Sequence, residues 1–167
     1  MDSTNQRQGV GCNSVPRPEK LIGSQPAGKL TILLVEDSPP DVYLIREALR
    51  RENLEVDLKV AEDGEEAAQW LLNLELSDKP WPKLVLLDLN TPRCEGKEVL
   101  QKIKGAPWGC SIPVIVITSS NSPADREDAF RLGASWYFRK PSDLNEFMEI
   151  GGVVRHLLFG PANGGSS

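Results

Sequence analysis

Between residues 29 and 159, short apolar runs alternate with segments that repeat apolar side chains at helical spacing. Runs that are apolar almost throughout are typical of strands buried on both faces of a sheet. In 56–60, apolar and polar side chains alternate instead, which predicts a strand exposed on one face, near an edge of the sheet. The predicted strands are 30–35, 56–60, 84–89, 112–117 and 135–138.

Signals for helix starts lie between these strands. Pro39 and Pro40 precede the first helical pattern, where missing N–H donors cost little. Asp63 is a predicted N-cap followed three residues later by a glutamate, and Ser122 and Ser142 are the predicted N-caps of the last two helices. The predicted helices are 41–51, 63–72, 96–104, 122–133 and 142–158. The last one is expected to be weakened by its two glycines and to turn these side chains inward: Leu144, Phe147, Ile150, Val154 and Leu157 or Leu158.

Strands that alternate with helices need right-handed crossovers, which predicts an α/β fold with a doubly wound, five-stranded parallel sheet and five helices. The sequence predicts one such domain over 29–159. Residues 1–28 are rich in Ser, Pro, Gly, Gln and Asn and predict a flexible N-terminal arm. Residues 160–167 predict a flexible C-terminal tail.

Composition narrows the function classes. The net charge of −5 argues against binding to nucleic acid or to anionic lipid. The chain has no apolar segment long enough for a bilayer crossing, and Met1–Gly11 lacks the apolar core of a secretory signal. The three cysteines, Cys12, Cys94 and Cys110, cannot all pair within one chain and lack metal-site spacing. A reducing cytoplasm is therefore the expected location.

Polar residues close four of the five apolar runs. Glu36-Asp37 follow the first strand, Asp88 the third, Thr118 the fourth and Lys140 the fifth. If the strands follow the common 2-1-3-4-5 order, these ends meet in one cleft, where α/β sheets bind ligands. Carboxylates placed so close repel one another, and both Lys140 and a divalent cation would relieve that repulsion.

Mg2+ suits such a site because it prefers oxygen ligands. Asp37 and Asp88 would offer carboxylate oxygens, Asn90 a main-chain carbonyl, and Glu36 a contact through water. Each feature alone also has a simpler interpretation. Glu36-Asp37 would cap a helix, Asp88 would start an Asx turn, and Thr118 and Lys140 would be ordinary loop residues. Their joint position at the strand ends favours a phosphate site.

Four segments, ILLVEDSPPD, LVLLDLNTP, IPVIVITSS and GASWYFRKP, resemble the successive signatures of receiver domains of bacterial two-component response regulators. The resemblance covers about 29–159 and implies the flavodoxin-like receiver fold with strand order 2-1-3-4-5. It implies that Asp88 is the phosphoacceptor and that Glu36, Asp37, Asp88 and Asn90 hold Mg2+. It also implies that Thr118 and Lys140 contact the phosphoryl group, that Tyr137 is the switch aromatic, and that the Lys140–Pro141 bond is cis.

The family's function implies the partners. A sensor histidine kinase would donate the phosphoryl group. The segment LLVEDSPPDVYLIREAL and the connection 74–83 resemble standalone receivers that work with cyanobacterial and other bacterial phytochromes. The domain would catalyse only its own phosphotransfer and autodephosphorylation. Switching would alter the surface formed by 122–133, 135–138 and the last helix, through which a homodimer is one expected output. No helix-turn-helix pattern follows Phe159, so DNA output is not expected.

Two other classes remain open on sequence grounds. The first is a phosphatase with an aspartyl-phosphate intermediate, similar to haloacid-dehalogenase-like enzymes, although Asn90 stands where those enzymes carry a second acid. The second is a scaffold that uses the fold for binding without phosphorylation. The only histidine, His156, lies late in the last helix and is interpreted as a surface residue, so the phosphodonor would be another protein.

Overall fold

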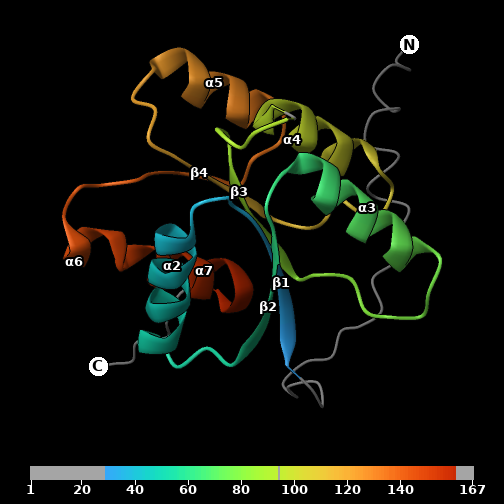
Figure 1. Ribbon diagram of the computed structural model, residues 1–167, viewed down its shortest axis with the longest axis horizontal. Helices are drawn as coiled ribbons and strands as arrows, with labels where there is room; N and C mark the ends of the chain where they lie inside the picture. Colours follow the sequence, from blue (N-terminus) through green and yellow to red (C-terminus); the bar gives the residue numbers. More distant parts are fainter. Residues whose placement is uncertain (1–28, 94, 161–167) are drawn as a thin grey trace, which may run out of the picture.

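The computed structural model describes residues 29–93 and 95–160. Its centre is one parallel sheet with the strand order β2-β1-β3-β4-β5, which confirms the predicted fold (Figure 1). The strands are β1 (Leu30–Val35), β2 (Val56–Ala61), β3 (Leu84–Asp88), β4 (Val114–Thr118) and β5 (Trp136–Arg139).

Burial follows the hydrophobic pattern of each strand. All residues of β3 and β4 are buried, because both strands lie inside the sheet with helices on each face. β2 lies at one edge and is largely half-buried, in agreement with its alternating pattern. β5, at the other edge, buries Tyr137 and exposes Trp136 and Arg139.

Several helices begin at side-chain caps, and two of these caps, Asp63 and Ser122, were predicted. Side chains of Ser38, Asp63 and Ser122 each accept a hydrogen bond from a backbone N–H in the first turn of the helix that follows. The helices are α2 (Pro39–Arg51), α3 (Gly64–Glu75), α4 (Gly96–Gly105), α5 (Pro123–Arg131), α6 (Leu144–Phe147) and α7 (Glu149–Phe159). Among the described residues, none of these helices combines the length and apolar character needed to cross a bilayer.

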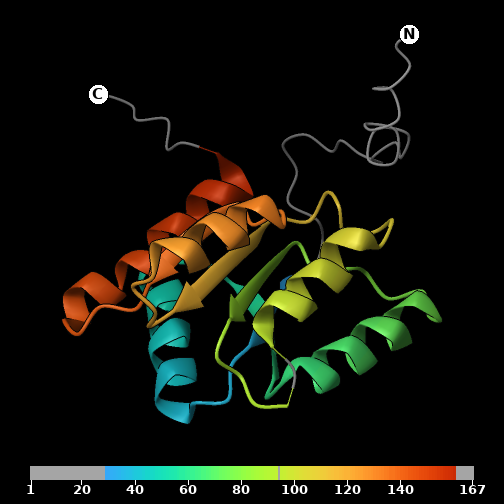
Figure 2. The same ribbon diagram turned by 90° about the horizontal axis from the view of Figure 1, so that it is seen from above.

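The sheet separates two apolar layers (Figure 2). Helices α3, α4 and α5 pack on one face, with Leu71, Leu100 and Ala129 in the core. Helices α2 and α7 pack on the other face, where Ile45 and Ile150 are fully buried. The helices cover both faces of the sheet, so the polar residues that follow the strands lie together at its carboxyl edge.

The last predicted helix is divided in the structure. Its first turn, α6, begins after the N-cap Asp143 and not after the predicted cap Ser142, and α7 starts beyond Met148. Phe147, Ile150 and Val154 are buried as predicted, but Leu144 is 52% exposed and its inward assignment is wrong. The expected cis bond before Pro141 is also wrong, because the described chain has only trans peptides.

Several predictions concern residues outside the described part. The predicted flexible arm, 1–28, lies there, as do 161–167 of the predicted tail, Cys12 and Cys94. Cys110 is described and is a half-buried free thiol.

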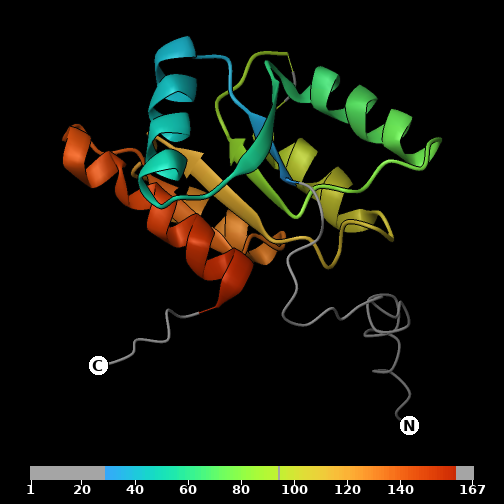
Figure 3. The ribbon, with the colours of Figure 1, turned by 90° about the horizontal axis from the view of Figure 1, so that it is seen from below.

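Helices α2 and α7 lie side by side (Figure 3), and they approach each other closely at Gly151. A Cβ atom at Gly151 would lie 2.4 Å from the carbonyl oxygen of Ala48 in α2. At the neighbouring Gly152, a Cβ atom would meet nothing within 4 Å. The glycine pair therefore has two different roles, with close packing at the first position only.

We expect Gly151→Ala to lower the free energy of unfolding by about 2 kcal/mol, because backbone must move to admit the methyl group. Gly152→Ala is the matched control and should raise it by about 0.5–1 kcal/mol, since alanine favours a helix over glycine. Urea unfolding of the two variants measures both changes. Equal stability of the two variants would contradict the packing role of Gly151.

Candidate functional site

The carboxyl ends of β1, β3, β4 and β5 lie along one edge of the sheet. Asp88 ends β3 and pairs with Ile117 of β4, while Thr118 pairs with Arg139 of β5. The backbone N–H of Lys140 then donates to the carbonyl of Thr118 at 2.7 Å. This register brings the polar residues that follow each strand to the same place.

Three carboxylates meet at this edge. Ligand oxygens of Glu36, Asp37 and Asp88 all lie within 4.8 Å of one another. Glu36 and Asp88 are buried, whereas Asp37 is exposed. The predicted acidic residues are thus brought together, with one of them facing solvent.

Lys140 is the positive centre of the site. Its ammonium donates to Glu36 Oε2 at 2.8 Å, to Asp88 Oδ2 at 3.0 Å and to Asp41 Oδ2 at 2.7 Å. An ammonium has three protons, so these three carboxylates use its full donor capacity. The side chain is only 14% exposed, so water screens these ion pairs weakly.

Asp41 was not among the sequence-predicted site residues. It lies in the first turn of α2, where a negative side chain interacts favourably with the helix dipole. This local role already explains an aspartate at this position, so the sequence did not indicate a role in the site. From the start of α2, which begins with Pro39 and Pro40, the carboxylate of Asp41 reaches the ammonium of Lys140. No feature of the sequence distinguished Asp41 as a partner of Lys140, since three other carboxylates were already predicted near that ammonium.

Burial and charge change the pKa values of the central pair. Burial, together with the nearby Asp88, raises the pKa of Glu36 to about 7 against the opposing effect of Lys140. Burial alone would lower the pKa of Lys140, but its hydrogen bonds to Asp41, Glu36 and Asp88 outweigh burial and raise that pKa. Lys140 is therefore firmly cationic, while the carboxylates around it still carry excess negative charge.

The loop after β3 is held tightly. The backbone N–H of Asn90 donates to Asp88 Oδ1 at 2.9 Å, so Asp88 does form the Asx turn considered from sequence. Gly96, at the start of α4, lies against this loop, and a Cβ there would be 2.4 Å from Leu89 Cα. Only glycine allows this approach, and sequence reasoning did not assign Gly96 to the site.

Thr118 is fully buried beside this loop. Its hydroxyl oxygen accepts from Asn90 Nδ2 at 3.2 Å and from the N–H of Ser120 at 3.0 Å. A hydroxyl accepts two hydrogen bonds and donates one. With both acceptor positions used, the hydroxyl proton is what Thr118 can offer to an incoming group.

Tyr137 lies next to the loop after β4. The residue is 8% exposed, and its hydroxyl donates to the carbonyl of Ser120 at 3.4 Å. The resemblance implied that Tyr137 is the switch aromatic, and in this structure the residue is buried. His156, by contrast, is exposed on α7, as predicted.

The donor set fits a hard divalent cation. Every candidate ligand is an oxygen, and Lys140 compensates only part of the negative charge. The exposed carboxylate of Asp37 leaves one side of the cluster accessible to an ion that keeps some of its water. The same charges can receive a phosphoryl group only with added positive charge, which a cation would provide.

Comparisons with known proteins agree with this geometry. The family model of the response regulator receiver domain matches residues 32–150. Response regulator Rcp1 of Synechocystis sp. is 37% identical over 120 residues, which are 71% of this chain and 82% of that protein. The crystal structure of the phosphorylated cyanobacterial phytochrome response regulator RcpA has a TM-score of 0.72 and 33% identity, covering 81% of this chain and 98% of that one. The Mn2+-bound form of Rcp1 has a TM-score of 0.70 and 34% identity, covering 81% and 99%.

We expect Lys140→Met to lower the free energy of unfolding by about 3 kcal/mol in metal-free buffer at pH 7, because three carboxylates lose their counter-charge. Urea unfolding with a chelator present measures this change. Lys79→Met, in an exposed loop, is the control and should have little effect. If both variants unfold at the same urea concentration, Lys140 does not hold the site together.

Proposed function

We propose that this chain, which belongs to the response regulator receiver family, accepts a phosphoryl group on Asp88 from a phosphohistidine of a sensor histidine kinase. The observation that carries the proposal is the convergence of Glu36, Asp37 and Asp88 around the ammonium of Lys140. Such a site neutralises charge on a transferred phosphoryl group and places a carboxylate nucleophile beside it.

In the transfer step, one carboxylate oxygen of Asp88 attacks phosphorus in line. The new P–O bond forms as the P–N bond breaks, and the electron pair of the broken bond stays on the departing imidazole of the kinase. Lys140 offsets the negative charge of the phosphoryl oxygens. Water later attacks the acyl phosphate, which releases inorganic phosphate and restores the carboxylate.

Mg2+ is the proposed cofactor. Asp37 and Asp88 would hold it through carboxylate oxygens, Asn90 through its main-chain carbonyl and Glu36 through water. When bound, the ion would supply the positive charge that phosphoryl transfer requires. The acidic cluster supports this proposal, and a relative is recorded in a Mn2+-bound form.

Signal output is proposed to start at Thr118. Its hydroxyl proton would donate to an oxygen of the phosphoryl group, because its two acceptor positions are already used. Tyr137 contacts the same loop, so the two residues would report the state of Asp88 to the surface of α5, β5 and α7. A partner protein or a second copy of the chain would read that surface.

The kinase partner is proposed to be a bacterial phytochrome. The similarity to Rcp1 and to the phytochrome response regulator RcpA supports that choice. A shallow hollow of about 390 Å³ beside Glu36 and Asp37, lined also by Tyr43 and Arg46 of α2, would admit a kinase near the acceptor. Such a partner is consistent with the predicted cytoplasmic location.

The two alternative functions fit less well. A phosphatase of the haloacid-dehalogenase-like class needs a second acid two residues after its nucleophile, and here Asn90 donates its side-chain amide to Thr118. Turnover of small phosphomonoesters would favour that class. A scaffold without phosphorylation would not need three carboxylates close together, because their mutual repulsion is unfavourable.

We expect the purified protein to gain the mass of one phosphoryl group when it is incubated with acetyl phosphate and Mg2+. Asp88→Asn should abolish the gain, because the amide replaces the nucleophile. Intact-mass spectrometry measures both proteins, with Asp78→Asn as an exposed aspartate control. A gain that persists in Asp88→Asn, or that never occurs in the wild type, would refute the assignment of Asp88.

Mg2+ should stabilise the folded protein. At a hundredfold excess over its dissociation constant, a ligand adds about 2.7 kcal/mol to the free energy of unfolding. Asp37→Asn should lose more than half of that gain, because a neutral amide replaces a carboxylate ligand. Urea unfolding at a series of Mg2+ concentrations measures the effect.

Asp78→Asn again provides the control for that titration and should respond to Mg2+ like the wild type. A wild type that Mg2+ leaves unchanged, or an Asp37→Asn variant that responds fully, would exclude the proposed metal site.

A further inference from the structure

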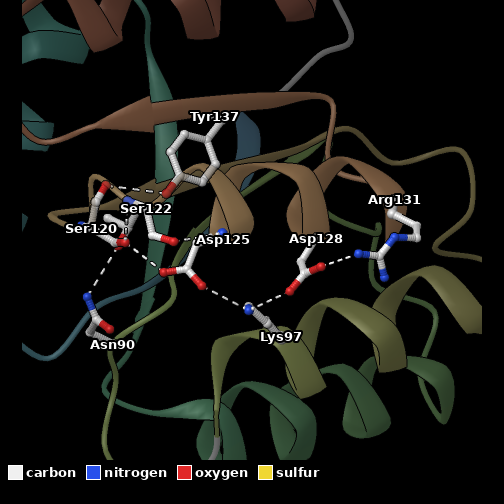
Figure 4. Close-up of polar contacts among 9 residues, drawn as sticks. Asn90, Lys97, Ser120, Ser122, Asp125, Asp128, Arg131 and Tyr137 are labelled. Atoms are coloured by element: carbon white, nitrogen blue, oxygen red, sulfur yellow. Dashed lines mark hydrogen bonds and ion pairs between the residues drawn. The ribbon is translucent and has the colours of Figure 1, made fainter.

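A second polar network begins at Thr118 and continues to α5 and α4. Figure 4 shows its part from Asn90 and Ser120 to Lys97 and Arg131. Its central residue is Ser120, in the loop after β4. The N–H of Ser120 donates to Thr118 Oγ1, and its carbonyl accepts from the hydroxyl of Tyr137. Its own hydroxyl donates to Asp125 Oδ2 at 2.6 Å and accepts from the N–H of Ser122 at 3.1 Å. Ser120 therefore links the two proposed switch residues through one short loop.

Asp125, in the first turn of α5, fixes Ser120 from the far side. Its other carboxylate oxygen accepts from the ammonium of Lys97 in α4 at 3.0 Å. Lys97 also donates to Asp128, one turn further along α5, at 2.9 Å. Figure 4 shows Lys97 pointing across from α4 toward these two carboxylates of α5. Lys97 thus ties the helix that follows Asp88 to the helix that follows Thr118.

Residues of α5 cover the ring of Tyr137. The guanidinium of Arg126 lies 5.5 Å from the centre of the Tyr137 ring and 5.3 Å from that of Phe130. The rings of Phe130 and Tyr137 lie 6.5 Å apart. The position of α5 consequently decides whether Tyr137 stays covered, and Lys97 holds α5 through two charge-assisted hydrogen bonds.

We propose that Lys97 and Asp125 are positioning residues that hold the Ser120 loop, so that the Tyr137 ring stays buried and the Thr118 hydroxyl stays directed for donation. Loss of the Lys97 contacts shifts the population toward an outward ring. This equilibrium exists without a phosphoryl group, and phosphorylation acts on it. The link to signalling rests on the proposed function, but the position of the ring does not.

The two tyrosines of the chain make a direct measurement simple. Tyr137 is buried, whereas Tyr43 is 64% exposed on α2 and serves as an internal reference. Protein labelled with 3-fluorotyrosine gives one 19F NMR resonance for each, and Tyr43→Phe assigns them. The sample is kept free of phosphodonors and metal.

In Lys97→Met, the Tyr137 resonance is expected to move toward that of an exposed tyrosine or to divide into two, while the Tyr43 resonance stays in place. Lys97→Arg should restore the wild-type position, because arginine can still donate to both carboxylates. Ser120→Ala should shift the Tyr137 resonance like Lys97→Met, since it cuts the same link to Asp125.

Arg131→Gln is the matched control. Arg131 pairs with Asp128 at the outer end of the network, and the contacts of Lys97 with Asp125 do not involve it. A Tyr137 resonance that is unchanged in Lys97→Met would overturn the proposal. An equal shift in Arg131→Gln would also overturn it, because loss of any charge on α5 would then suffice. A moved Tyr43 resonance in Lys97→Met would mean general unfolding and would count against a specific role.

The outcome is separable from that of the phosphorylation experiment. A wild-type protein that never gains a phosphoryl group refutes the proposed function and leaves the 19F result valid. An unchanged ring in Lys97→Met refutes the positioning role, even where Asp88 is phosphorylated normally.

Discussion

Four carboxylates share the carboxyl edge of this sheet with the ammonium of Lys140. Parallel strands in register bring Glu36 and Asp88 to that edge, and the start of α2 adds Asp41. Carboxylates at this spacing repel one another, and burial of two of them strengthens the repulsion. Lys140 donates a hydrogen bond to each of three of these carboxylates. The positive charge that offsets their repulsion in the folded state therefore comes from a residue far along the sequence. An excess of negative charge remains at this edge, and a divalent cation would offset it.

The same constraint connects the site with the rest of the fold. Lys140 lies directly after β5, and its N–H donates to the carbonyl of Thr118, so charge balance at Asp88 depends on the ends of β4 and β5 together. Thr118 in turn contacts the loop after β3 through Asn90 and the loop after β4 through Ser120. Hydrogen bonds therefore connect Asp88 with α5 and α4 through Asn90, Thr118 and Ser120. Under the proposed function, a change of charge at Asp88 would act on these helices through the same contacts.

The sequence predicted the elements that depend on local pattern. Apolar runs identified the buried strands. The caps at Asp63 and Ser122 were predicted from residue type alone, whereas the cap at Ser38 was not predicted. Strand order came from the family resemblance, because periodicity carries no information on which strands are neighbours. Asp41 was missed since a first-turn aspartate already has a local reason. The predictions of an inward Leu144 and of one continuous last helix were wrong. Helical spacing does not reveal that the helix is interrupted at Met148. Lys97 and Asp125 could not be paired from sequence, since only packing of α4 against α5 brings them together.

The central claim is that these acids hold a hard cation beside a reactive carboxylate. Its most direct test is a crystal structure of the protein with Mn2+, in which anomalous scattering locates the ion. The account predicts one strong peak about 2.0–2.2 Å from carboxylate oxygens of Asp37 and Asp88, with Lys140 still bound to Glu36. A well-ordered site without a peak at millimolar Mn2+, or a peak bound only by other residues, would contradict it.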